Sequence, residues 1–405
     1  MPFNIALSGL NAAASDLDVT ANNIANVNTT GFKGSRAQFA DVFAVSNLDV
    51  SSTAVGNGVR LATVAQQFGQ GNIEYTNNNL DLALSGQGFF TVRDGTGLSY
   101  TRAGAFATDN SGYVVNAQGQ HLQVFPPLAT GGFDLSRTVD LQALTTQSAP
   151  QATTSAQLAL NLPANATPPT NPVFNPADPT SYNQSTSFTV YDSLGATHTA
   201  TTYFANTGAG TWNTYLYIDG TAAGGAQPIA FNQNGALTTP ASGQLAFPPT
   251  TINPGAAPLA ISLNLANASQ YGNSFAVGSI NQNGYPTGTM TGLDISATGV
   301  VSARFSNGQS QPLGQVALAN FADPQGLQKL GNTTWGQTYA SGAAVRGAAG
   351  SGTFGQIQSG ALEDSNVDIT AQLVNMIKAQ RNYQANAQMI QADGKVTQAI
   401  LNITP

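Results

Sequence analysis

Cysteine is absent from the sequence and charged residues are scarce. Without cysteine, the 405-residue chain can form no disulfide, no thiolate zinc site and no cysteine nucleophile. Only 8% of its residues are Asp, Glu, Lys or Arg, whereas about a quarter is usual in soluble domains. Because only 41% are hydrophobic, Ser, Thr, Asn, Gln and Gly must cover much of the surface. Such a surface repels little and can pack or slide against copies of itself.

Positive charge and long apolar runs are also in short supply. The 12 Lys and Arg residues are thinly spread and the net charge is −7, so no nucleic-acid partner is expected. No uninterrupted apolar run reaches about 20 residues, so no membrane insertion is expected. The first basic residue is Lys33, so the N-terminal stretch lacks the basic region of a signal peptide.

Side chains suited to acid–base chemistry are few. Glutamate occurs only as Glu74 and Glu363, and histidine only as His121 and His198, with no local carboxylate or hydroxyl constellation around either histidine. We expect both histidines to lie on sheet surfaces. The stretch Gly350-Ser-Gly-Thr-Phe-Gly355 has the spacing of a dinucleotide-binding turn, but no apolar strand precedes it, so we interpret it as a glycine-rich loop. The sequence predicts no enzyme, no cofactor and no metal site.

What the chain does have is a heptad pattern at both ends. Small or apolar residues recur there at alternating spacings of three and four, which places them on one stripe of a helix. In residues 1–30 they are Phe3, Leu7, Leu10, Ala14, Leu17, Ala21 and Ile24. In residues 365–405 they include Ile369, Leu373, Met376, Tyr383 and Ile390. A terminal amphipathic helix can simply dock on its own domain. We expect instead that these residues form an assembly interface, in which the two helices pair with each other and with neighbouring copies.

The ends of these helices are also predicted. Asn and Gly tolerate the left-handed conformation that closes a helix, so the first helix should stop between Asn26 and Gly31. Ser365 and Asp368 have the spacing of a capping box, with Ser365 as the N-cap of the second helix. Glu363 and Asp364 suit the positive end of that helix.

The middle of the chain is rich in glycine and in strand-like runs. Strands are predicted at 89–92, 113–115 and 212–218, and a hairpin over 300–321 with its turn at 306–308. Prolines are dense in residues 150–179 and 240–258, which disfavours central strands and long helices there. Residues 31–71 hold few apolar runs and are interpreted as a connecting segment.

Several motifs resemble those of the bacterial flagellar axial proteins of the rod and hook. They are Asn22-Asn-Ile-Ala-Asn26 with Thr30-Gly-Phe-Lys33, residues 78–90, 100–104, 112–116 and 313–321, Gly360 to Asp368, and Gln380-Arg-Asn-Tyr383. The resemblance covers roughly residues 1–145 and 290–405. It marks as family residues Asn22, Asn23, Asn26, Gly31, Phe32, Lys33, Asn366, Asp368, Arg381 and Asn382.

The resemblance implies a fold of mixed α and β class. Residues 1–30 and 365–405 would form an α-helical coiled-coil domain that lines an inner tube, and the connecting segment 31–71 would lead from the first helix to the β-domains. An inner β-domain would comprise 72–149 and 289–364, with an outer β-domain, 150–288, inserted into it. Rod members are shorter and lack such an insert, so its presence favours the hook branch of the family.

For function, the resemblance implies a structural subunit that polymerises helically into a curved, hollow tube, a universal joint that passes motor torque to the filament. Implied partners are copies of the same chain, the distal rod, hook cap and hook–filament junction proteins, and the flagellar type III export apparatus. The implied location is extracellular, in the hook of the flagellum.

Two alternatives remain open. One is a distal-rod protein with an unusual insert. The other is a secreted β-rich adhesin, suggested by the aromatic residues Tyr182, Tyr191, Tyr203, Trp212, Tyr215 and Tyr217. We expect these aromatic residues to lie in the core of a sheet instead.

Overall fold

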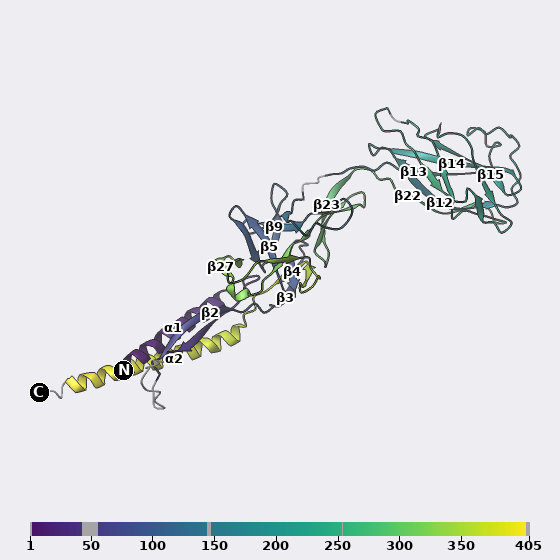
Figure 1. Ribbon diagram of the computed structural model, residues 1–405. Helices are drawn as coiled ribbons and strands as arrows, with labels where there is room; N and C mark the ends of the chain where they lie inside the picture. Colours follow the sequence, from purple (N-terminus) through teal and green to yellow (C-terminus); the bar gives the residue numbers. More distant parts are fainter. Residues whose placement is uncertain (1, 43–55, 144–146, 253, 402–405) are drawn as a thin grey trace. The chain divides into compact units, whose positions relative to one another are not determined.

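Two helices at the ends of the chain flank a body made mostly of strands. The computed structural model describes residues 2–42, 56–143, 147–252 and 254–401. Helix α1 spans Pro2–Ala25 and helix α2 spans Ile369–Leu401 (Figure 1), where the heptad patterns predicted helices. The N-cap of α2 is Asp368, whose Oδ1 accepts the backbone N–H of Thr370 at 2.8 Å and of Ala371 at 3.1 Å. The prediction that Ser365 caps this helix was therefore wrong.

The chain forms two compact units, which are described separately. The first comprises Met1–Leu144, Gly292–Ala303 and Ser310–Pro405, and the second comprises Thr145–Thr291 and Arg304–Gln309. The unit boundaries fall in or beside β23 (Gly288–Ile295), β24 (Val300–Phe305) and β25 (Ser310–Val316).

In the first unit, a hairpin accompanies the helices and a larger sheet forms the body. Besides β24 and β25, its strands are β1 (Ser35–Asp41), β2 (Val59–Gln66), β3 (Ile73–Tyr75), β4 (Leu82–Ser85), β5 (Phe89–Asp94), β6 (Gly97–Thr101), β7 (Phe106–Thr108), β8 (Val114–Asn116), β9 (His121–Phe125), β10 (Val139–Asp140), β26 (Leu318–Asn320), β27 (Gln328–Gly331), β28 (Thr334–Gly336), β29 (Val345–Gly347), β30 (Gln356–Ser359) and β31 (Ala361–Glu363). Strands β25, β9, β5, β6, β28 and β27 are neighbours in that order. The predicted strands at 89–92 and 113–115 and the hairpin at 300–321 are confirmed.

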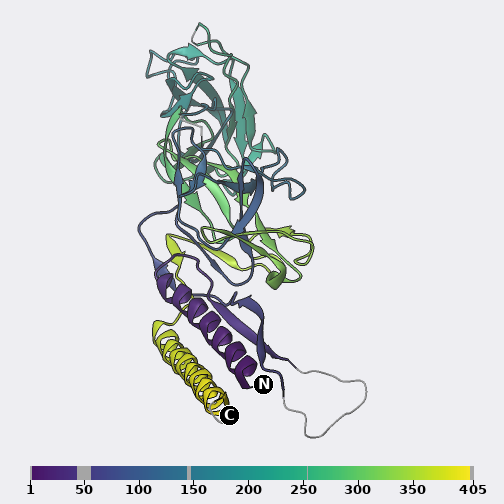
Figure 2. The ribbon, with the colours of Figure 1, turned by 90° about the vertical axis from the view of Figure 1, so that its left-hand side faces the viewer.

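The described part of segment 31–71 contains a hairpin, and residues 43–55 of the segment lie outside the described residues. Strands β1 and β2 pair antiparallel over their whole lengths. The hairpin contacts α1, and Figure 2 shows it alongside that helix.

Aromatic side chains of the neighbouring body meet edge to face, with Phe89 and Trp335 at 5.7 Å between ring centroids. These aromatic side chains form a packed core within the first unit.

The second unit is built from two sheets that share one hydrophobic core. Its strands are β11 (Gln147–Ser148), β12 (Ser155–Pro163), β13 (Gln184–Tyr191), β14 (Thr197–Gly208), β15 (Thr211–Ile218), β16 (Thr221–Ala222), β17 (Gln227–Phe231), β18 (Leu237–Thr239), β19 (Gln244–Ala246), β20 (Ser262–Asn264), β21 (Ser269–Tyr271) and β22 (Ala276–Gln282). One sheet has the order β13-β14-β15-β17-β18, and in the other β12 pairs with β20, β21 and β22. Alternate residues of β12 and β15 are buried, so each sheet turns one face to the core.

Two expectations for this unit fail in part. β12 is a central strand inside the proline-dense stretch 150–179, because Pro150 precedes it and Pro163 is its last residue, so no proline interrupts its interior. Among the aromatic residues, Trp212 is fully buried in the core as expected. Tyr203, Tyr215 and Tyr217 are half-buried at the alternate positions of their strands, away from that core, and Phe174 stacks on Tyr215 at 3.8 Å.

Candidate functional site

The two terminal helices lie side by side and run antiparallel (Figure 2). Asn23, near the end of α1, donates a hydrogen bond to Gln372, near the start of α2, at 3.4 Å. Gly9, in the first half of α1, lies so close to α2 that a Cβ there would sit 2.5 Å from Oδ1 of Asn386. The helices approach through small residues, and α1 buries Ala6, Ala13 and Thr20 at heptad spacing.

The large apolar residues of the expected seam lie elsewhere on the helix surfaces. In α1, Phe3 is 46% exposed and Leu7 is 39% exposed, Ala21 is also exposed, and Leu10, Ala14, Leu17 and Ile24 are half-buried. In α2, Ile369, Leu373 and Tyr383 are exposed, while Met376 and Ile390 are half-buried. Further apolar side chains of α2 are open to solvent, among them Ile377 at 50% and Val396 at 57%. One chain alone therefore leaves much of its apolar helix surface uncovered.

The segment after α1 anchors the helix to the rest of the first unit. Asn23 is buried, and its side chain both accepts the backbone N–H of Ser35 at 2.8 Å and donates to the carbonyl of Ser35 at 2.7 Å. Asn26 caps the end of α1 by donating to the carbonyl of Asn22 at 2.9 Å. Gly31 has φ +68, and a Cβ there would lie 2.3 Å from the backbone nitrogen of Ala103. Only glycine suits this close, left-handed position.

A buried carboxylate ties together segments that are distant in the sequence. Glu363 accepts from Nζ of Lys33 at 2.5 Å and from Nη1 of Arg102 at 3.2 Å, and the carboxylate is fully buried. It also accepts the backbone N–H of Gly71 at 2.9 Å. Burial lowers the pKa of Lys33, and Glu363 opposes that effect; burial also lowers the pKa of Arg102. This ion cluster fixes the strand before α2 against the chain that follows α1.

The start of α2 is held by the same region. Asn366 accepts the backbone N–H of Gly34 at 2.8 Å and donates to the carbonyl of Gln67 at 2.6 Å. Of the ten family residues, most meet at this junction or cap the helix ends beside it. Arg381 and Asn382 do not, because both are exposed midway along α2.

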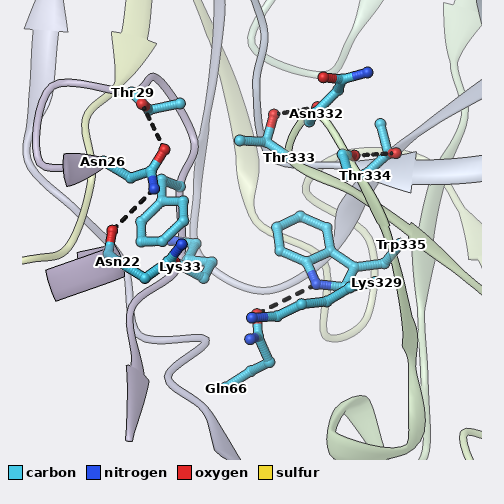
Figure 3. Close-up of a pocket in the computed structure, with 12 residues that line it drawn as sticks. Asn22, Asn26, Thr29, Lys33, Gln66, Lys329, Asn332, Thr333, Thr334 and Trp335 are labelled. Carbon is cyan, nitrogen blue, oxygen red and sulfur yellow. Dashed lines mark hydrogen bonds between the residues drawn. The ribbon is translucent and has the colours of Figure 1, made fainter. Parts of the chain in front are cut away.

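A pocket of about 430 Å³ opens beside this junction (Figure 3). Asn22, Asn26 and Thr29 line one side, and the β27–β28 hairpin with Lys329 and Trp335 lines the other. The turn of that hairpin holds Thr333 at φ +56, a conformation that β-branched residues rarely adopt. The polar groups that line the pocket can donate and accept hydrogen bonds. Sequence reasoning did not find this pocket, because its two sides lie about 300 residues apart.

The structure corrects the role expected of Glu363 and the surface position expected of a histidine. Glu363 serves the buried ion cluster and not the start of α2. Nδ1 of His121 lies 3.1 Å from Oδ2 of Asp140, and the side chain is 31% exposed on β9. The expectation that His198 lies on a sheet surface was wrong. His198 is buried and lies between Asp192 and Asp219. Asp192 is six residues away in the sequence and could have been noticed; Asp219 comes from another hairpin.

Among the described residues, no group of three or more His, Asp or Glu side chains could hold a metal ion. Neither α1 nor α2, within the part of the chain that is described, is long and apolar enough to cross a membrane.

Comparison with known proteins gives the class first. Residues 3–33 match the flagella basal body rod protein model, and residues 83–168 match the flagellar hook protein FlgE/F/G D1 domain. Residues 161–285 match the flagellar basal body protein FlaE D2 domain, and residues 358–403 match the flagellar basal body rod FlgEFG protein C-terminal model. These models define the class of flagellar rod and hook proteins.

Relatives that match over the full length identify the family within that class. The chain is 40% identical to the flagellar hook protein FlgE of Salmonella typhimurium and 39% identical to that of Escherichia coli, over 100% of both chains in each case. It therefore belongs to the flagellar hook protein FlgE family. The crystal structure of Helicobacter pylori flagellar hook protein FlgE2 shares the fold, with a TM-score of 0.51, 15% identity, and coverage of 70% of this chain and 99% of that chain. These relatives are structural proteins of the flagellum and indicate a location in its hook.

Proposed function

We propose that copies of this chain polymerise helically into the curved, hollow tube of the flagellar hook, a universal joint between motor and filament. The observation that carries this proposal is the apolar surface of α1 and α2 that a single chain leaves uncovered, with Leu373 at 45% and Ile377 at 50% exposed. Burying such side chains stabilises association by about 25 cal/mol per Å² of apolar surface. A heterologous contact that does not close on itself extends into a filament.

In this proposal, the terminal helices of all copies form a coiled-coil layer that lines the tube. The small-residue face of α1 packs on α2 within one chain, and the larger side chains at Phe3, Leu7 and Leu373 pack against neighbouring copies. The inner β-domain and the inserted outer β-domain face outward. With 8% charged residues, their surfaces form few ion pairs between copies, so neighbouring rows slide as the tube bends.

The junction gives this arrangement a way to pass torque. The ion cluster of Lys33, Arg102 and Glu363 and the hydrogen bonds of Asn23 and Asn366 hold the helices on the body of the first unit. Force on the β-domain is then transmitted to the helix layer instead of being lost in a loose linker. The remaining proposed partners are the distal rod, the hook cap, the hook–filament junction proteins and the type III export apparatus. Because that apparatus would export the chain, the proposed location of the assembled protein is outside the cell.

Polymerisation of seam variants tests the proposal. Leu373→Asp places a charge on the apolar face of α2, at a side chain that is 45% exposed in a single chain, and should abolish polymerisation of the purified chain. Gln388→Asp places the same charge at an exposed polar position of α2 and serves as the matched control. Circular dichroism should show both variants folded, while electron microscopy and sedimentation measure assembly. Normal polymers from Leu373→Asp would overturn the helix-layer model.

The shape of the polymer separates the hook from its nearest alternative. Curved tubes from the unaltered chain support the hook, and straight, rigid rods favour a distal-rod protein with an insert. Secretion is measured separately in cells, because the export apparatus can read the N-terminal segment independently of assembly.

A further inference from the structure

His198 lies in the second unit between the carboxylates of two different hairpin turns. Its Nδ1 is 2.6 Å from Oδ2 of Asp219, and its Nε2 is 3.3 Å from Oδ2 of Asp192. Asp192 belongs to the turn between β13 and β14, and Asp219 belongs to the turn between β15 and β16. The side chain of His198 is 8% exposed and that of Asp192 is 4% exposed. The imidazole therefore bridges two turns, one through the buried carboxylate of Asp192 and one through the carboxylate of Asp219, which is 42% exposed.

Each carboxylate also holds its own turn. Oδ1 of Asp192 accepts the backbone N–H groups of Leu194 and Ala196, both at 2.8 Å. Oδ1 of Asp219 accepts the backbone N–H of Thr199 at 2.8 Å. With these oxygens occupied by the backbone, the second oxygen of each carboxylate is the one that meets the imidazole.

This geometry favours one protonation state of the ring. A neutral imidazole carries one N–H and one lone pair, so one of its nitrogens would face a carboxylate oxygen lone pair to lone pair. The imidazolium donates from both nitrogens and satisfies both carboxylates. Burial alone would lower the pKa of His198, but the hydrogen bonds to Asp219 and Asp192 outweigh burial and raise it.

The turn that His198 holds abuts the segments through which the chain enters and leaves the second unit. Gly195 sits so close to them that a Cβ there would lie 3.0 Å from Cβ of Pro150 and 3.2 Å from the backbone nitrogen of Thr287. Beside it, the backbone N–H of Tyr191 donates to Oγ1 of Thr153 at 2.9 Å. The position of the 192–196 turn therefore bears directly on these connecting segments.

We infer that His198 is a proton-controlled latch, whose doubly protonated ring clamps the 192–196 turn to the 219–220 turn and against the connecting segments of the second unit. Loss of one ring proton breaks one of the two bridges and leaves a buried carboxylate facing a lone pair. The turn then opens locally. This inference does not depend on polymerisation and concerns the second unit of each chain.

The direction of the pH dependence follows from the two kinds of group that face each other, the histidine and the carboxylates Asp192 and Asp219. The pKa of His198 is raised in the fold, so its stabilising contribution is complete below about pH 6.5 and is lost as the pH rises through the folded value. The pKa of Asp219 is lowered, chiefly by His198 and the Thr199 amide against the effect of burial, so its contribution is lost only in acid below about pH 4. The latch is firm in mildly acidic medium and loosens as the pH rises through the raised pKa of His198.

Nuclear magnetic resonance of the full unassembled chain tests this inference. With labelled histidine, His121→Gln leaves the ring of His198 as the observed signal. The expected result is a doubly protonated ring that persists above the ordinary histidine range. Amide hydrogen exchange at Leu194 and Ala196, corrected for the intrinsic rate, should rise by about three- to tenfold between pH 6 and pH 9.

His198→Gln supplies the matched comparison, because glutamine carries no titrating group and should make the corrected exchange independent of pH. If that variant does not fold, the ring titration and the exchange of the unaltered chain still decide. A ring that is neutral at pH 7, or exchange at 194 and 196 that does not respond to pH, would overturn the latch.

Discussion

Glu363 holds one negative charge against two positive charges in a region closed to water. Its partners Lys33 and Arg102 are almost fully buried, with side-chain exposures of 0% and 5%. Taking charges out of water is costly, so both cations depend on the carboxylate and on backbone carbonyls. The carbonyl of Gly69 accepts from Lys33, and that of Gly86 accepts from Arg102, whose Nε is left without a hydrogen-bond partner among the described residues. Removing Glu363 would leave two buried cations facing each other, whereas removing Lys33 would leave a single ion pair with Arg102.

This asymmetry predicts the order of two substitutions. Glu363→Gln should destabilise the first unit by about 3–5 kcal/mol, and Lys33→Met should cost less because Arg102 still pairs with the carboxylate. The control Glu74→Gln, at the chain's other, exposed glutamate, should change stability by less than about 0.5 kcal/mol. Urea unfolding followed by Trp335 fluorescence in a Trp212→Phe background measures each variant.

Trp335 lies in the first unit, next to the junction pocket, so this signal reports the unit that contains the ion cluster. A greater loss from Lys33→Met than from Glu363→Gln would contradict the account of the cluster.

At the scale of single residues, the sequence indicated which positions matter, but it did not indicate which residues they contact. The motif from Asn22 to Lys33 marked the residues that meet at the junction, but nothing in their spacing indicated that Lys33 would find Glu363, 330 residues away. Such pairing depends on how the strands bring the two ends together. The same reason hid Asp219 from His198, since the sheet brings strand β14, which holds His198, close to the turn that holds Asp219.

At the scale of elements, the helices were predictable because a heptad pattern repeats many times. The end of α1 and the hairpin at 300–321 also followed from local residues, whereas the cap of α2 was assigned to Ser365 and is Asp368. The pattern did not reveal which face each helix uses within one chain. Small residues at Ala6, Ala13 and Thr20 form the buried face of α1, and the large apolar residues lie beside it. Small side chains let helices approach closely but give a weak signal in sequence.

Overpacking distinguishes the two faces of α1. Ala13 is 6% exposed, so Ala13→Leu should strain the packing around α1 and cost about 1–3 kcal/mol. Ala21 is exposed, and Ala21→Leu in the same helix should change stability by less than about 0.5 kcal/mol. Hydrogen exchange of α1 amides in the unassembled chain measures both. Equal protection in the two variants would show that the buried face is assigned wrongly.

At the scale of the whole molecule, a single chain leaves apolar helix surface uncovered. Its β units bury their cores, while α2 keeps apolar side chains in water along most of its described length. A helix of this kind is stable in an assembly that covers it, because packing and not helix propensity provides most helical stability. Membership of the hook protein family agrees with that requirement.

The central claim is that the terminal helices form the inner layer of a curved tube made of many copies. A cryo-electron microscopy map of the polymer formed by the purified chain tests it most directly. The account predicts α1 and α2 lining the central channel, with Leu373 and Ile377 buried against neighbouring copies. A map in which these side chains remain exposed, or in which the helices lie on the outside, would contradict the claim.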